Sequence, residues 1–227
     1  MPSTRREFLD RLAVGAALGA LPVALGAATW PRDHEPAPHA AGDWDVSWSG
    51  RLRGKHKVVF DVPEVESGYG VWRASIWEKQ YQQVLGTPAR DLSAAVVLRH
   101  NGIVLAMQQP YWDEYGVGKE WKVTHPVTAE PTDRNPALLS SARGEVPAEL
   151  DAVALDRFLA RGGIALACDL ALQEYVVAPI QKKHGVSAEE ARKRALALMV
   201  PGVIVQPSGI FAVVLAQDAG CSYVRAS

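Results

Sequence analysis

The stretch from Gly162 to Gly185 constrains the fold of this chain more than any other. Two glycines precede a short, unbroken apolar run that ends at Cys168, and the apolar spacing then changes abruptly to that of a helix. A short apolar run followed at once by a helix indicates a strand that is buried on both faces of a parallel sheet. The sequence therefore predicts a buried strand that leads into a helix, with Cys168 at the turn between them.

Cys168 lies where parallel sheets usually carry their chemistry. Ligands bind outside the carboxyl ends of the strands, and a helix that begins there offers free N–H groups and a positive dipole end. Both effects favour a thiolate, the reactive form of cysteine, whereas the negative charge of the next residue, Asp169, opposes it. The residues leave the sign of the net effect open.

Strand-like segments alternate with helical ones along most of the chain. This alternation favours an α/β fold in three layers, α/β/α, with a five-stranded, mainly parallel sheet and right-handed crossovers. With 227 residues, of which 48% are apolar, the chain can bury one core of good size. Besides the strand that ends at Cys168, the predicted strands are residues 57–62, 92–98, 203–205 and 220–224.

Two predicted helices carry side chains whose role is open. A helix that begins at Ser67-Gly68 and ends at Gly86 carries a wide apolar face at helical spacing, made by Trp72, Ile76 and Leu85 with Trp77, Tyr81 and Val84 beside them. We interpret this face as core packing against the sheet, with a ligand-stacking wall or an oligomer contact as the alternatives. A second helix follows the capping box at 187–190, and its basic residues 192–194 indicate a solvated face.

Residues 108–145 form an unusual section. It holds four prolines and four large aromatic residues, without lasting periodicity. A loop of this length inside a compact domain is usually functional or disordered, and disordered segments are normally poor in aromatic residues. We therefore predict an ordered excursion that acts as a lid over the edge that carries Cys168.

Two further sites follow predicted strands and belong to the same edge. His100 follows the strand 92–98 and is a candidate for proton transfer or anion contact, with a merely solvated side chain as the alternative. Ser208 and Gly209 follow the fourth strand and present a hydroxyl and backbone N–H groups to an anion or substrate. The alternative for Ser208 is an ordinary helix N-cap.

The N-terminal 28 residues have the character of an export signal. The run Thr4-Arg5-Arg6-Glu7-Phe8-Leu9 resembles the twin-arginine motif, and an apolar, alanine-rich run follows it to Ala28. Cleavage after Ala28 would leave a periplasmic protein, exported in folded form, without a stable membrane span. An uncleaved anchor or a chance Arg-Arg pair is the alternative. We expect residues 29–55 to form a linker and an edge segment, with a half-buried strand at 44–48, and residues 56–227 to form the domain.

Several classes of function lack support in the sequence. The formal net charge is −1 and no basic stripe is present, so binding to nucleic acid is not predicted. No phosphate loop, metal-ligand spacing or serine nucleophile motif occurs, so we predict no cofactor and no metal. The two cysteines, Cys168 and Cys221, lie at opposite ends of predicted parallel strands, roughly 15 Å apart, so we predict two free thiols.

With the strands and helices predicted in this order, residues 57–223 resemble the DsrE/DsrF-like family of sulfur-relay proteins. The resemblance implies a three-layer fold with a five-stranded parallel sheet and assembly as a homo-oligomer. It also implies that the cysteine at the position of Cys168 accepts sulfur as a persulfide. The residues that carry the resemblance are Gly163-Ile164-Ala165-Leu166-Ala167-Cys168, the stretch 200–209 (VPGVIVQPSG) and the ending 216–223 (AQDAGCSY).

Two hypotheses for function follow. In the first, the chain is an exported sulfur-handling protein, possessing the activity of a sulfur carrier or sulfurtransferase. Cys168 takes sulfur from a small anionic donor that His100 and Ser208 help to bind, and passes it to a partner protein. In the second, the chain is a non-catalytic periplasmic binding or assembly module of DsrE-like fold, in which Cys168 is one more small buried hydrophobic residue.

Overall fold

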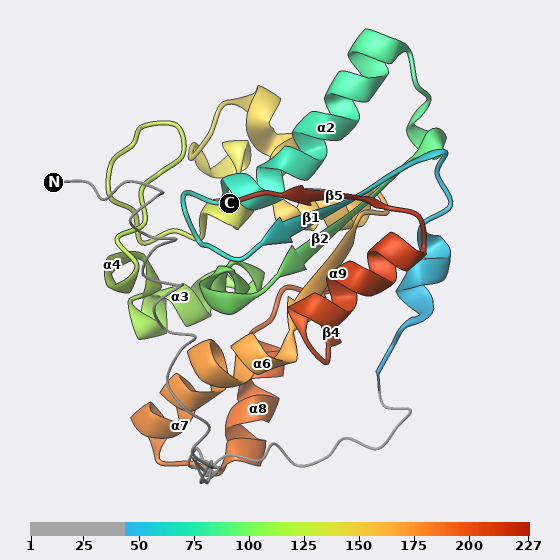
Figure 1. Cartoon of the computed structure of the whole chain (residues 1–227). Coiled ribbons are helices and arrows are strands. Elements are labelled where there is room, and N and C mark those ends of the chain that lie inside the picture. The colour runs from blue at the N-terminus through green and yellow to red at the C-terminus, as the bar shows by residue number, and fades with distance from the viewer. Residues whose placement is uncertain (1–43) are drawn as a thin grey trace, which may run out of the picture. The chain divides into compact units, whose positions relative to one another are not determined.

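The structure, a computed structural model, describes residues 44–227. The predicted signal peptide and most of the predicted linker therefore lie outside the described residues. Five strands form one sheet in the order β4-β3-β2-β1-β5, and every neighbouring pair is parallel (Figure 1). The strands are β1 (His56–Val62), β2 (Leu92–Leu98), β3 (Ile164–Cys168), β4 (Ile204–Gln206) and β5 (Ser222–Arg225).

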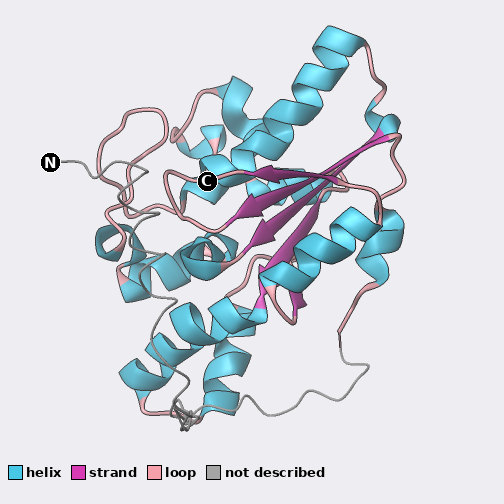
Figure 2. Ribbon diagram, viewed as in Figure 1, coloured by secondary structure: helices cyan, strands magenta, loops and turns pink. Residues whose placement is uncertain are grey.

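Helices cover both faces of the sheet, which confirms the predicted three-layer α/β/α class (Figure 2). The α-helices are α2 (Tyr69–Leu85), α3 (Gln109–Tyr115), α4 (Val117–Glu120), α5 (Leu155–Ala160), α6 (Asp169–Leu172), α7 (Ala178–His184), α8 (Ala188–Ala197) and α9 (Gly209–Asp218). Short 3-10 helices are η1 (Ser47–Arg51), η2 (Ala89–Asp91), η3 (His100–Ala106), η4 (Pro136–Leu138), η5 (Ser141–Arg143) and η6 (Ala148–Val153), and η7 (Gln173–Val177) is a π-helix.

Strand β3 and the last five residues of β2 are apolar at every position because both of their faces are buried. Along β2, Val96 and Leu98 enter the core that α2 covers, whereas Val97 enters the core that α9 covers. Successive side chains of a strand point to opposite faces, so a strand between two helical layers has no polar side. No helix within the described residues is long and apolar enough to cross a membrane.

The predicted edge strand at residues 44–48 is wrong, because this segment enters the 3-10 helix η1. The side chain of Asp45 accepts hydrogen bonds from the backbone N–H of Ser47, at 2.9 Å, and from its hydroxyl, at 2.6 Å. Such local bonds offer the backbone a turn in place of an extended strand. The turn directs Trp48 into the core beneath α9, where its side chain is fully buried.

Helix α2 follows its predicted bounds, but the predicted core face continues only through its first half. Trp72 is buried, whereas Ile76, Val84 and Leu85 are exposed. The last turns of α2 extend beyond the sheet (Figure 1), so these side chains have no core to enter.

The helix that follows Cys168 contains one wide turn. Pro179 has no N–H to donate to the carbonyl of Tyr175, four residues earlier, and its ring would clash with that carbonyl in a regular helix. The chain adopts the π-helix η7 instead, in which the N–H of Ala178 bonds to the carbonyl of Gln173, five residues back. The hydroxyl of Tyr111 donates to the freed carbonyl of Tyr175 at 2.9 Å. The irregular turn therefore lies immediately before Pro179.

The excursion at residues 108–145 folds into short helices. Hydrogen bonds from buried polar groups attach this segment to the rest of the domain. The buried amide of Asn135 donates to the carbonyls of Leu105, at 3.1 Å, and Met107, at 2.7 Å. The indole N–H of Trp112 donates to the carbonyl of Val104 at 2.8 Å. These bonds tie the excursion to η3 and the segment after it, which follow the carboxyl end of β2.

Glu145, the last residue of the excursion, accepts hydrogen bonds from three residues of that segment. Its carboxylate accepts hydrogen bonds from the side chains of Arg134 and Arg143, both at 2.8 Å, and from the backbone N–H of Ser140, at 3.0 Å. Burial acts to raise the pKa of Glu145, but the hydrogen bonds from Arg143 and Ser140, with the charges of both arginines, lower the pKa below its ordinary value.

The substitution Glu145→Gln should lower the free energy of unfolding by about 1–3 kcal/mol at pH 7, because it weakens hydrogen bonds to a charged group. A carboxyl group whose pKa is lowered in the folded state stabilises the protein above its unfolded pKa and loses that effect as the pH falls. Urea unfolding at pH 7 and near pH 3 should therefore show a large difference between the variant and wild type only at pH 7. The exposed Glu149→Gln serves as the control, and an equal loss at both pH values would contradict the assignment.

Candidate functional site

The carboxyl ends of β2, β3 and β4 bring the residues singled out in the sequence to one edge of the sheet. Leu98 pairs with Ala167 in the register of β2 and β3, so the next residues lie side by side: Arg99 follows the end of β2 and Cys168 is the last residue of β3. Cys168 in turn pairs with Gln206 of β4. His100, Ser208 and Gly209 follow within three residues of these strand ends.

Cys168 caps the helix that it precedes. The backbone N–H of Ala171, in the first turn of α6, donates to the Sγ atom of Cys168 at 3.5 Å. The residue is 6% exposed and packs at the border of the core. Cys221, at the start of β5, is 7% exposed, and both thiols are free, as predicted.

The charge of Asp169 is balanced by an ion pair. Asp169 is buried, and the Nη1 atom of Arg192 in α8 donates to its Oδ1 atom. The prediction that Arg192 belongs to a solvated face is therefore wrong, because the arginine turns inward to a carboxylate that α6 buries. The negative charge that opposes a thiolate at Cys168 has a positive partner in direct contact.

Arg99 supplies a second positive charge, held by a carboxylate inside the sheet. Its Nε and Nη2 atoms donate to Oδ1 and Oδ2 of Asp61 at 2.6 and 2.8 Å, and the hydroxyl of Tyr223 donates to Oδ2 at 2.9 Å. The hydrogen bonds to Asp61 raise the pKa of Arg99 against the effect of burial. Leu98, which precedes Arg99, pairs with Ala167, which precedes Cys168, so Arg99 begins beside Cys168 at the same edge of the sheet.

Sequence reasoning missed the Asp61–Arg99 pair, although a signal was present. Asp61 lies in an otherwise apolar run, Val58-Val59-Phe60-Asp61-Val62. A buried carboxylate requires a partner, and the first residue after the neighbouring strand is an arginine.

Ser208 and Gly209 have structural roles at this edge. The Oγ atom of Ser208 accepts a hydrogen bond from the N–H of Phe211 at 3.0 Å, so Ser208 is the N-cap of α9. A Cβ atom on Gly209 would lie 2.6 Å from both Cβ and Cδ of Arg99. The absence of a side chain at Gly209 thus lets α9 begin directly against the stem of Arg99.

His100 contacts the π-helix. Its Nε2 atom lies 3.2 Å from the hydroxyl of Tyr175, and the two rings meet edge to face with centroids 5.4 Å apart. His100 has a left-handed backbone, with φ of 48°. Through its contact with Tyr175, His100 links the end of β2 to the π-helix η7, which begins five residues after Cys168.

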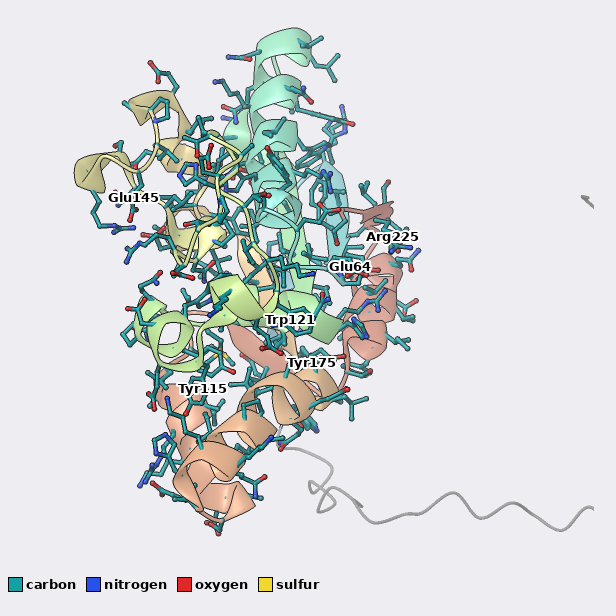
Figure 3. All side chains as sticks on the ribbon, turned by 90° about the vertical axis from the view of Figure 1, so that its left-hand side faces the viewer. Glu64, Tyr115, Trp121, Glu145, Tyr175 and Arg225 are labelled. Carbon is teal, nitrogen blue, oxygen red and sulfur yellow. The ribbon has the colours of Figure 1, made fainter. Side chains whose placement is uncertain are left out.

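A pocket of about 560 Å³ opens between the excursion and η7. The excursion contributes α3, α4 and Trp121, and η7 and α7 form the opposite wall. Figure 3 labels Tyr115, Trp121 and Tyr175 on the side of the molecule where this pocket lies. The lining residues are Val104, Tyr111, Tyr115, Val117, Glu120, Trp121, Glu174, Tyr175, Ala178, Pro179 and Lys182.

The expected lid is therefore a wall of its own pocket, which Cys168 does not line.

No group of three or more residues that could hold a metal ion occurs among residues 44–227. A second pocket, of about 340 Å³ and bordered by the amino ends of β2 and β3, is lined by four arginines, Arg51, Arg53, Arg90 and Arg161.

Comparisons with known proteins do not assign a family. No protein-family model matches the sequence, and no curated protein matches it. Among solved structures, one similar chain is a protein of unknown function, MTH1491 from Methanobacterium thermoautotrophicum, with 14% sequence identity and a TM-score of 0.36. The match covers 75% of this chain and 98% of that chain. A similarity at this level supports no conclusion about function, and the resemblance to the DsrE/DsrF-like family stays a prediction.

The substitution Gly209→Ala should lower the free energy of unfolding by about 1–3 kcal/mol, because the new methyl group overlaps the stem of Arg99. Gly50→Ala is the matched control, since nothing lies within 4 Å of a Cβ atom at that position. Urea denaturation measures both variants. Equal midpoints for the two would show that α9 can move away from Arg99 at no cost.

Proposed function

We propose that this protein handles sulfane sulfur, with Cys168 as the residue that carries it. The observation that supports the proposal is the electrostatic setting of one thiol. The Sγ atom accepts an N–H at the start of α6, Arg99 follows the end of the strand beside Cys168, and Arg192 balances the adjacent carboxylate of Asp169. Positive groups and helix N-termini stabilise the thiolate, which is the nucleophilic form of cysteine.

The reaction needs no cofactor and no external oxidant. The thiolate of Cys168 attacks the outer sulfur of a donor R–S–SH, a new S–S bond forms, and the donor's S–S bond breaks. The products are the Cys168 persulfide and the thiolate R–S⁻, so one disulfide-type bond replaces another and no electrons are gained or lost. Transfer to an acceptor is the same exchange: the acceptor thiolate attacks the outer sulfur of the Cys168 persulfide, and Cys168 leaves as a thiolate.

The edge around Cys168 suits an anionic donor. Arg99 contributes a guanidinium group that is held in place by its pair with Asp61, the start of α9 at Ser208 and Gly209 contributes backbone N–H groups, and His100 follows the end of the neighbouring strand. Helix N-termini and arginine side chains attract anions. The donor class in the proposal is therefore a small anion that carries sulfane sulfur.

The proposal includes export and assembly. The twin-arginine motif at residues 4–9 supports a periplasmic location, where an acceptor protein would take the sulfur. Assembly as a homo-oligomer has support in the apolar side chains that the outer side of α9 and the edge strand β5 expose. These include Ile210, which is 72% exposed, with Val214 and Tyr223.

A second candidate function is a non-catalytic binding or assembly module. The burial of Cys168 favours this candidate, because free cysteines are among the most buried residue types and are often inert. The two candidates differ in what the thiol does in the folded protein.

Wild-type protein, reduced and then treated with glutathione persulfide, should gain the mass of one sulfur atom on Cys168, as measured by intact mass spectrometry. The Cys168→Ser variant should gain none, and the Cys221→Ser variant should gain as much as wild type. Cys221 is an internal control, because it is buried to the same degree while burial raises the pKa of its thiol. A sulfur adduct that persists in Cys168→Ser would refute the assignment.

Alkylation separates the two candidates further. In the folded protein, iodoacetamide should modify Cys168 at least about tenfold faster than Cys221, because burial raises the pKa of the Cys221 thiol and only the thiolate reacts. Unfolding in urea should bring the two rates together. Equal and slow rates in the folded protein, followed by fast modification of both after unfolding, would favour the non-catalytic module.

A further inference from the structure

We propose that the pocket between the excursion and η7 binds a small organic cation of the methylated-ammonium class. The proposal concerns a site that Cys168 does not line, so it stands independently of the sulfur chemistry.

The size and lining of the pocket suit a small molecule. Its volume, about 560 Å³, falls within the usual range of ligand pockets, which are mostly apolar with a few charged groups. Four aromatic side chains, one tryptophan and three tyrosines, line it around the apolar residues Val104 and Val117. The faces of aromatic rings carry negative potential and attract cations, and tryptophan does so most strongly.

The rings are held in place before any ligand arrives. Trp121 and Tyr175 meet edge to face, with centroids 5.8 Å apart. The hydroxyl of Tyr111 donates to the carbonyl that Pro179 leaves free at Tyr175, and the Tyr175 hydroxyl contacts His100. A site whose walls are fixed in this way loses little conformational freedom on binding.

One aromatic face at this site already carries an ammonium group. The Nζ atom of Lys183 lies 4.8 Å from the centroid of the Tyr115 ring, and this ring also stacks on Tyr111 at 4.6 Å and meets the His184 ring edge to face at 6.5 Å. Lys183 is held there by Glu114, whose carbonyl accepts from Nζ at 2.6 Å. The geometry therefore supports an ammonium against these rings, and Trp121 and Tyr175 provide the faces for a second one.

The charges that line the pocket favour a cation. Glu120 and Glu174 contribute two carboxylates and Lys182 one ammonium, and neither glutamate forms a salt bridge within the described part of the chain. Burial and the charges of Glu174 and Glu64 raise the pKa of Tyr175, which agrees with a negative field at this wall. An anion would meet two carboxylates here, whereas a methylated ammonium would offset them.

The test is isothermal titration calorimetry on the full chain, with choline as the probe. Its neutral analogue, in which a tert-butyl group replaces the trimethylammonium group, has the same shape without the charge. Choline should bind at least about tenfold more tightly than this analogue, as expected for contacts with aromatic faces and carboxylates. Equal affinities would overturn the assignment of a cation site, and so would the absence of choline binding.

A matched pair of substitutions at one wall separates the ring from the hydroxyl. Tyr175→Phe keeps the aromatic face and should leave choline affinity within about threefold, whereas Tyr175→Leu should weaken it at least about tenfold. Glu174→Gln, at an exposed position, should weaken choline and leave the neutral analogue unchanged, with the remote Glu149→Gln as control. Equal affinities of Tyr175→Phe and Tyr175→Leu would overturn the proposal.

The Cys168→Ser variant distinguishes this site from the proposed sulfur chemistry. It should bind choline as wild type does while it fails to gain sulfur. A loss of choline binding in this variant, with the fold intact by circular dichroism, would show that the pocket is not the independent site proposed here.

Discussion

The carboxylate of Asp61, buried inside the sheet, is the constraint on which the carboxyl edge depends. A charge in this position is stable only with a partner and with its remaining lone pairs satisfied. Arg99 and Tyr223 supply these bonds from the two strands that flank β1. The stem of Arg99 in turn requires a residue without a side chain at Gly209. One buried charge thus fixes β1, β2, β5 and the start of α9 relative to one another.

Local patterns in the sequence were enough for the architecture. Unbroken apolar runs are a consequence of burial on both faces, and the helix caps depend on residues at most three positions away, as at Ser187 and Ser208. The predictions failed where a local hydrogen bond or the length of an element overrode the pattern. Asp45 bonds to Ser47 and turns an alternating segment into η1, and the last turns of α2 extend beyond the sheet that its apolar face was expected to cover.

The candidate site was predictable only in part, for the same physical reason. Cys168 follows from a strand-to-helix junction, which is a local feature. The pairs Asp61–Arg99 and Asp169–Arg192 join residues that are 38 and 23 positions apart, and the aromatic pocket joins Trp121 to Tyr175. No periodicity records such contacts, because they depend on how the elements pack. The buried aspartate in β1 was the one sign in the sequence that a partner existed.

The π-helix η7 gives the segment after Cys168 one residue more than a regular helix would hold over the same path. Each residue of a helix turns the chain by about 100°. A deletion of one residue from a regular helix would rotate everything downstream by roughly that angle. The same deletion within η7 would remove only the extra residue, so the helix on either side of the wide turn would keep its phase and the aromatic wall would keep its direction relative to the junction at Cys168.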